Sequence, residues 1–189
     1  MTVPTKKSRM FTRRVDRGDF VDKVAQRWVV ERAAVTMYKE AIARLRVNEL
    51  LQGLIPELER FAFQEQLHAD MLEQLHRELG RGDVHGAHAS PGVNLAASTM
   101  AAILESVRAP RATARSILEA ILMAERVDYG GWELLTDLAK DGGLDEEWLR
   151  SFRAADREER EHDHLVRTHL ARLEHEMLLH ERFPVAEPR

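Results

Sequence analysis

Four long segments of the chain place apolar residues at alternating spacings of three and four, the pattern of a helix with one buried face. We expect these helices over residues 19–47, 56–80, 111–140 and 146–182, with a shorter one over 95–107. No stretch shows the sustained period-two alternation that predicts a strand. The pattern therefore predicts an all-α fold, a four-helix bundle. A crossover of about 30 residues, containing the short helix, would make the second and third long helices parallel.

Glycine and proline residues mark the ends of these helices. Pro56 suits the first turn of the second helix, and the glycines at 142 and 143 end the third. The clearest loop covers residues 80–92. Its two histidines, His85 and His88, have no partner at helical spacing, and we expect both at the surface.

The bundle is expected to form one domain over residues 19–182. The preceding arm, residues 1–18, is strongly basic. We expect it to be solvated and poorly ordered, the alternative being contact with an anionic surface or partner. Residues 183–189 form a short C-terminal tail.

The composition narrows the classes of function. A net charge of -4 gives no electrostatic support for nucleic-acid binding. The chain contains no cysteine, which excludes disulfides, thiolate metal sites and iron–sulfur clusters. No apolar run reaches the roughly 18 residues of a membrane span, and none resembles a signal peptide. We therefore expect a cytoplasmic protein that binds neither nucleic acid nor membranes.

Each long apolar stripe is interrupted near its middle by a glutamate. These glutamates are Glu31, Glu65, Glu125 and Glu159, and the second and fourth helices add His68 and His162. In the third helix the predicted stripe continues from Glu125 through Tyr129 to Trp132. Burying a charge without a partner is costly, so these polar residues should have something to bind.

The spacing of these residues repeats along the chain. Glu65 follows Glu31 by 34 residues, and Glu159 follows Glu125 by the same number. Each first-helix glutamate is followed seven residues later by an aromatic residue. Two helix pairs related by a pseudo-twofold axis would bring four carboxylates and two imidazoles together. That donor set suits a pair of first-row metal ions.

Four Glu-x-x-His pairs occur in the chain, and only two lie on the stripes. Glu73/His76 and Glu161/His164 fall off the stripes, and we expect them on solvated faces. The two pairs on the stripes, 65/68 and 159/162, share the 34-residue repeat. The alternative to a metal site for these two is a buried network of ion pairs.

The pattern resembles the ferritin-like di-iron carboxylate superfamily, especially its bacterioferritin and rubrerythrin branches. The matching pieces are Glu31-x6-Tyr38, EQLH at 65–68, AERVDYGGW around Glu125 and EREH at 159–162. The resemblance covers about residues 20–180. Without cysteine, the chain lacks the rubredoxin module that rubrerythrins usually carry.

The resemblance implies a centre of two iron ions, with manganese or a mixed pair as alternatives. The implied ligands are Glu31, Glu65, His68, Glu125, Glu159 and His162. Glu65 and Glu159 would bridge the ions, and each ion would take one histidine. Asp128 is a possible seventh ligand, because rubrerythrins carry an extra glutamate there; the alternative is a role outside the ligand set.

Further residues of the family's site have counterparts here. In bacterioferritin-like chains, the acid before each Glu-x-x-His orients the other histidine. Those positions are Gln64 and Glu158, so the match is half complete. Tyr38 resembles the family's tyrosine near the metals, and with Glu65 and Glu159 it is a candidate catalytic residue. The alternative is a core aromatic whose hydroxyl binds a carboxylate.

The resemblance implies a di-iron oxidoreductase that reacts with O2 or H2O2, as an oxidase, peroxidase or hydroxylase, using an unknown small substrate or electron donor. The alternatives are a ferroxidase that binds and stores iron, and a non-catalytic bundle stabilised by metal. The chain lacks the short fifth helix of cage-forming ferritins. The end of its last helix, near residues 178–180, is apolar. We therefore expect a homodimer or small homo-oligomer.

Overall fold

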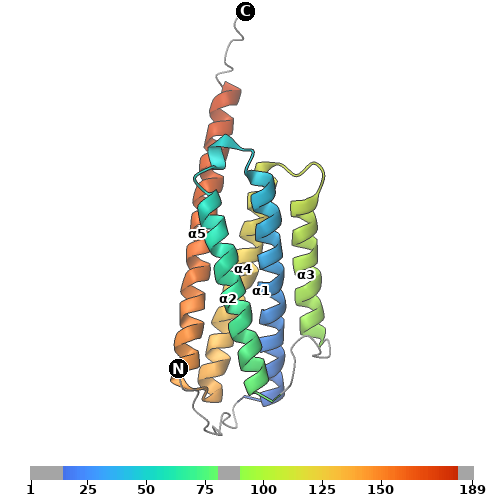
Figure 1. Ribbon diagram of the computed structural model, residues 1–189, viewed down its shortest axis with the longest axis vertical. Helices are drawn as coiled ribbons and strands as arrows, with labels where there is room; N and C mark the ends of the chain where they lie inside the picture. The colour runs from blue at the N-terminus through green and yellow to red at the C-terminus, as the bar shows by residue number, and fades with distance from the viewer. Residues whose placement is uncertain (1–14, 81–89, 183–189) are drawn as a thin grey trace, which may run out of the picture.

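The structure is a computed structural model that describes residues 15–80 and 90–182, with side chains described to residue 178. Its described residues form helices and no strand, which confirms the all-α prediction. In chain order the elements are α1 (Arg17–Leu45), the 3-10 turn η1 (Glu49–Leu51), α2 (Ile55–Glu78), α3 (Pro91–Arg108), α4 (Ala114–Gly142) and α5 (Glu146–Arg182) (Figure 1).

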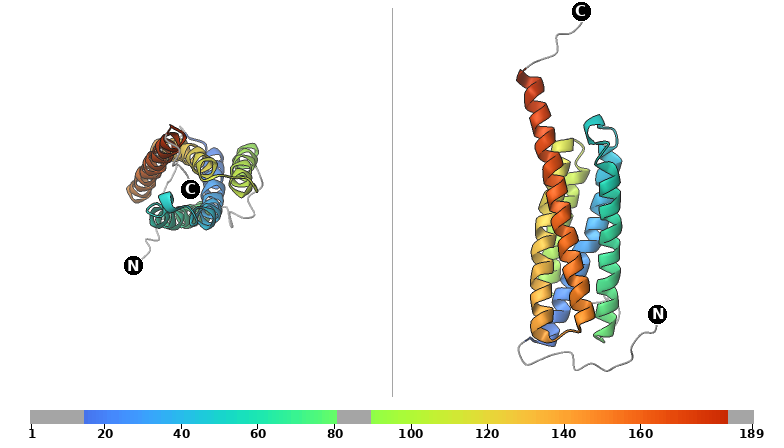
Figure 2. Two further views of the ribbon diagram at one scale, coloured as in Figure 1. Left: turned by 90° about the horizontal axis from the view of Figure 1, so that it is seen from above. Right: turned by 90° about the vertical axis from the view of Figure 1, so that its left-hand side faces the viewer.

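Four of the helices surround a common centre, and α3 lies outside them. Seen from above in Figure 2, α1, α2, α4 and α5 are arranged around the centre, while α3 packs against α1 and α4. In Figure 1, α3 carries the chain back from the end where α2 finishes to the end where α4 begins. As a result α2 and α4 run in the same direction.

Capping residues explain where the helix ends differ from the predicted ones. Asp16 accepts hydrogen bonds from two backbone N–H groups, so α1 begins before residue 19. Ser90 caps α3, which is longer than predicted because it starts at Pro91. Thr113 and Ser116 form a capping box, which starts α4 after residue 111. Gly143, with φ of 75°, ends α4 where the sequence predicts a break.

The apolar core is divided into two clusters. One contains Tyr38, Phe61 and Leu118, and the other contains Phe20, Trp132 and Phe152. Burying each large apolar side chain contributes about 1.5–3 kcal/mol. The two clusters hold the helices together on either side of a polar layer. That layer contains the six residues predicted as metal ligands.

Some predictions concern residues that the structure does not describe. The loop histidines His85 and His88, the tail and most of the basic arm lie outside the described residues. The last residues of the arm belong to α1, which begins at Arg17. Among the described residues, no helix has the length and apolar character needed to cross a membrane.

Candidate metal centre

The structure brings all six residues predicted as metal ligands into one buried cluster. Four helices supply them: α1 and α4 one glutamate each, and α2 and α5 one Glu-x-x-His pair each. These residues are between 0% and 4% exposed. They form two overlapping groups whose donor atoms lie within 4.8 Å of one another. The groups are Glu31, Glu65, His68 and Glu159, and Glu65, Glu125, Glu159 and His162.

Helical spacing explains how each pair reaches the centre. Residues three apart on a helix share a face, so the glutamate and histidine of each pair point the same way, one turn apart. Apolar residues precede and follow each pair on that face, and they are buried in the two core clusters. The packing of the apolar stripes therefore positions the polar layer.

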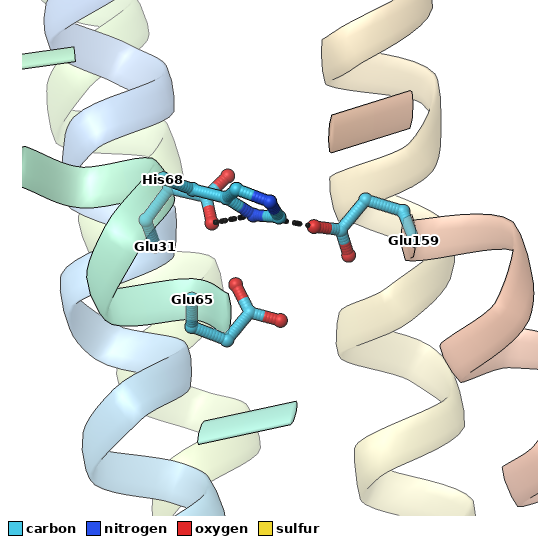
Figure 3. Close-up of side chains that lie close together, drawn as sticks. All are labelled: Glu31, Glu65, His68 and Glu159. Carbon is cyan, nitrogen blue, oxygen red and sulfur yellow. Dashed lines mark ion pairs between the residues drawn. The ribbon is translucent and has the colours of Figure 1, made fainter. Parts of the chain in front are cut away.

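The first group is arranged around His68 (Figure 3). Its Nδ1 atom lies 3.0 Å from Oε1 of Glu159 and 3.4 Å from Oε2 of Glu31. In Figure 3 the Glu65 carboxylate points into the same space between the helices. Carboxylates from α1 and α5 thus contact one imidazole nitrogen, and a donor atom of Glu65 lies within 4.8 Å of the other donors of this group.

The second group is arranged in the same way around His162. Its Nδ1 atom lies 3.3 Å from Oε2 of Glu125. It lies 3.4 Å from a carboxylate oxygen of both Glu65 and Glu159. Glu65 and Glu159 therefore face both histidines, from opposite sides of the cluster.

The other ring nitrogen of each histidine faces away from the cluster and has its own partner. Nε2 of His68 lies 2.8 Å from Oε2 of Glu158, and Nε2 of His162 lies 3.0 Å from Oε1 of Gln64. Each partner immediately precedes the Glu-x-x-His pair of the opposite helix, as the family pattern implies. When Nε2 donates its proton outward, the Nδ1 lone pair is available to a metal ion.

The chemistry of the inward atoms tests whether the cluster fits metal ions. Eight inward atoms form no hydrogen bond of good geometry with the described residues: Glu31 Oε2, both carboxylate oxygens of Glu65 and of Glu159, Glu125 Oε2, and Nδ1 of His68 and of His162. Such atoms are costly to bury unless they bind something. All are oxygen or imidazole nitrogen, which suit iron, manganese and zinc. The donor set could therefore hold metal.

Burial disfavours the negative charges of this cluster. It raises the pKa of Glu65 well above its usual value, and the nearby Glu159 carboxylate adds to the effect. Burial also raises the pKa of Glu125 to about 7. Without metal, bound protons must therefore neutralise part of the negative charge of these carboxylates.

The histidines hold protons tightly for the same reason. Burial alone would lower the pKa of His162, but the nearby carboxylates of Glu125 and Glu159 favour its protonated form and raise the pKa to about 9. Burial likewise opposes protonation of His68, and its hydrogen bonds, the strongest to Glu158, raise the pKa to about 12. In the metal-free protein, protonation of the two histidines would supply part of the positive charge that the carboxylates need.

An arginine missed by the sequence analysis lies beside the first group. Arg27 is only 4% exposed, and its Nε atom lies 3.2 Å from Oε1 of Glu31. Its Nη2 atom lies 2.6 Å from Oδ1 of Asp128. The i, i+4 spacing of Arg27 and Glu31, within an otherwise apolar stretch, was the available signal. Arg27 neutralises part of the excess negative charge.

Asp128 belongs to neither donor group, and it replaces Tyr129 on the buried face of α4. Asp128 is 2% exposed, whereas Tyr129 is half-buried with the Arg160 guanidinium 4.4 Å from its ring centre. A buried stripe on α4 can run from Glu125 to Trp132 through Asp128, by steps of three and four residues. It can also run through Tyr129, by steps of four and three. The predicted stripe, which runs through Tyr129, is wrong at this position, because the structure buries Asp128 there.

Aromatic rings enclose both imidazoles. Phe61 lies against His162, with ring centres 4.0 Å apart, and Trp132 and His68 form an edge-to-face pair with ring centres 5.5 Å apart. Tyr38 is fully buried, and its hydroxyl donates a hydrogen bond to Glu125. This contact matches the alternative reading of Tyr38 as a core aromatic bound to a carboxylate. The rings shield the cluster from water.

The two pairs off the stripes have different outcomes. Glu161 and His164 are exposed, as predicted. Glu73 is half-buried and pairs with Arg77 at 3.2 Å, but His76 is only 1% exposed. The prediction of a solvated face is therefore wrong for His76. That histidine lies four residues after Leu72 and three before Leu79, so it shares their buried face.

Comparisons of the chain with protein-family models, with curated proteins and with solved structures give no match. The feature that bears on function is the buried donor set, two overlapping groups of carboxylates and imidazoles that could hold metal.

Proposed function

We propose that this chain binds two first-row metal ions, iron in the first instance, with manganese or a mixed pair as alternatives. The observation that carries the proposal is the pair of donor groups that share Glu65 and Glu159. Shared carboxylates suit two ions held close together. Glu31 and His68 would complete one ion's ligands, and Glu125 and His162 the other's.

The arrangement of the helices supports a ferritin-like bundle. The two helix pairs, α1 with α2 and α4 with α5, each contribute one Glu and one Glu-x-x-His in a 34-residue repeat. The parallel course of α2 and α4, with α3 in the crossover, is the connectivity expected of that fold (Figure 1). Within it, Asp128 pairs with Arg27 and lies outside the ligand set.

We further propose that the protein is an oxidoreductase that reacts with O2 or H2O2 and uses a small substrate or an electron donor. Bound iron would supply the electrons that reduce the oxidant. The protein's own contribution is to hold the carboxylates in place and keep water out through the rings around both histidines. Tyr38 holds a proton at its hydroxyl, directed at Glu125. Arg27 offsets the charge of Glu31.

A small oligomer is the expected assembly. Met177 and Leu178, near the end of α5, are 44% and 56% exposed. Exposed apolar residues on a long helix are suited to pairing with a second copy. This assembly separates the proposal from an iron-storing cage.

Rapid mixing tests the reaction. The protein is loaded anaerobically with two equivalents of Fe(II) and mixed with O2 or with H2O2. We expect near-ultraviolet absorption to develop in the wild type and in Glu161→Ala, but not in Glu65→Ala. An unchanged Fe(II) spectrum would contradict the reaction. Uptake of hundreds of iron ions per oligomer, with the elution volume of a large shell, would replace it with storage.

A further inference from the structure

A separate cavity of about 400 Å³ lies between α1, α3 and α4, beside the metal centre. Its volume falls in the range of about 300–1,000 Å³ typical of small-molecule sites. Its lining is mixed, with the basic residues Lys23 and Arg27 and several apolar side chains. Arg27 also contacts Glu31, so one side chain both lines this cavity and contacts a candidate metal ligand.

Two adjacent glycines of α4 form part of the cavity wall. A Cβ atom on Gly131 would lie 1.6 Å from Nη1 of Arg27, so a side chain there would displace the guanidinium. A Cβ atom on Gly130 would meet nothing within 4 Å. Glycine is unfavourable within a helix. The missing side chain at Gly131 leaves room for the Arg27 guanidinium. At Gly130 it leaves part of the cavity open.

The charges of the cavity favour an anion. Arg27 is matched by Glu31 and Asp128. Lys23 is half-buried, and its Nζ atom donates to the neutral Oε1 of Gln26 at 2.9 Å. Within residues 15–80 and 90–178, no carboxylate forms an ion pair with Lys23. Its ammonium group therefore remains available for one negative charge.

The apolar part of the lining favours a ligand with a hydrocarbon portion. Leu95 on α3 and Leu134 on α4 are 69% and 46% exposed, although both line the cavity. Val127 on α4 is also exposed. Covering these side chains would remove apolar surface from water, which favours binding.

We propose that this cavity binds a small amphipathic monoanion, a carboxylic acid with an apolar chain or ring. Its carboxylate pairs with Lys23, and its apolar part lies against Leu95 and Leu134 and fills the space at Gly130. The binding step stands apart from the metal centre. The further step, that such an acid is the substrate oxidised there, rests on the proposed function.

Isothermal titration calorimetry of the full chain in chelator, with sodium octanoate as the probe, tests the binding step. We expect octanoate to bind wild type with a Kd below about 1 mM. Lys23→Gln should weaken it about tenfold, through loss of a charge-assisted contact. Gly130→Leu should abolish binding by filling the cavity. Lys39→Gln, at a lysine of α1 that lines a different cavity, should bind like wild type.

Three results would overturn the proposal: no binding to wild type, equal binding to Lys23→Gln and Lys39→Gln, or octanol binding as tightly as octanoate. Thermal melts of each variant show whether it is folded, and Lys23→Gln changes only a half-buried side chain. Metal content is measured on the same variants. A wild-type protein that takes up two metals but does not bind octanoate overturns this inference alone, whereas a wild-type protein that binds octanoate but no metal overturns the proposed function alone.

Discussion

His68 on α2 and Glu158 on α5 are 90 positions apart in the chain, and their side chains meet at 2.8 Å. The contact occupies Nε2 of His68 and directs Nδ1 toward Glu31 and Glu159. The equivalent contact in the other half joins His162 to Gln64, whose amide is neutral. Both histidines are therefore oriented by a contact at Nε2, but the partner is a charged carboxylate only for His68.

This difference predicts the effect of Glu158→Gln. Replacing the carboxylate by an amide keeps the shape but removes the charge that strengthens His68 as a ligand. We expect metal affinity to fall about 10- to 100-fold, the usual cost of losing such a partner. Competition with a coloured chelator measures it. Glu161→Gln, at an exposed glutamate of the same helix, should keep the wild-type affinity. Equal affinities of the two variants would contradict this account.

Glu65→Ala should damage metal binding and spare the metal-free fold. Burial and the Glu159 charge raise the pKa of Glu65, so the metal-free protein is destabilised by holding this carboxyl. In chelator we expect Glu65→Ala to melt at the wild-type temperature or above. Leu72→Ala, in the apolar core, should by contrast lose about 2–5 kcal/mol. A Glu65→Ala protein as unstable as Leu72→Ala would refute the prediction.

Replacing Arg27 alone should destabilise the fold more than replacing Arg27 and Asp128 together. Arg27→Met leaves Asp128 buried at 2% exposure without its cation. We expect a loss of about 3–5 kcal/mol in unfolding free energy, measured by urea denaturation. The double variant Arg27→Met/Asp128→Leu should recover most of this loss. A double variant as unstable as Arg27→Met would show that the unpaired Asp128 is not the cause of the lost stability.

The spacing of apolar residues was enough to predict the helices, because residues at alternating steps of three and four lie on one face of a helix. The cluster was predictable because Glu31, Glu65, Glu125 and Glu159 interrupt those stripes in a repeat. The structure places all six candidate ligands together, but their role as ligands stays a prediction. Helix ends were less accurate, since caps such as Ser90 depend on local hydrogen bonds.

Other features could not be read from spacing alone. Steps of three and four are equally helical, so the sequence left Asp128 and Tyr129 as competing choices for one buried position. The burial of Arg27 depends on the absence of a side chain at Gly131 on another helix. Such a contact between distant segments becomes visible only when the helices are packed.

The metal-free protein should lose stability as pH rises. The pKa of His162 is about 9 in the folded protein against an ordinary 6.5. A raised pKa means that the folded state holds the proton more tightly. Protonated His162 therefore stabilises the folded state fully below pH 6.5, and this stabilisation is lost as pH rises through about 9. The free energy of unfolding falls by up to about 1.4 kcal/mol per pH unit over this range. The raised pKa of Glu125, about 7, acts in the same direction between pH 4.5 and 7.

Denaturation in chelator at pH 6.5, 7.5 and 9 measures this loss. The control is the metal-loaded protein. Metal binding displaces the same protons, so affinity should rise with pH over this range. A metal-free stability that stays level from pH 6.5 to 9 would show that the histidines are not protonated in the cluster.

The most direct test of the two-metal centre is an anomalous difference map from crystals loaded with Fe(II) or Mn(II), recorded at the absorption edge of the metal. We predict two peaks, one in the group around His68 and one in the group around His162, with Glu65 and Glu159 next to both. Crystals of His164→Ala should show the same two peaks. A well-ordered crystal without anomalous density between these residues would contradict the account.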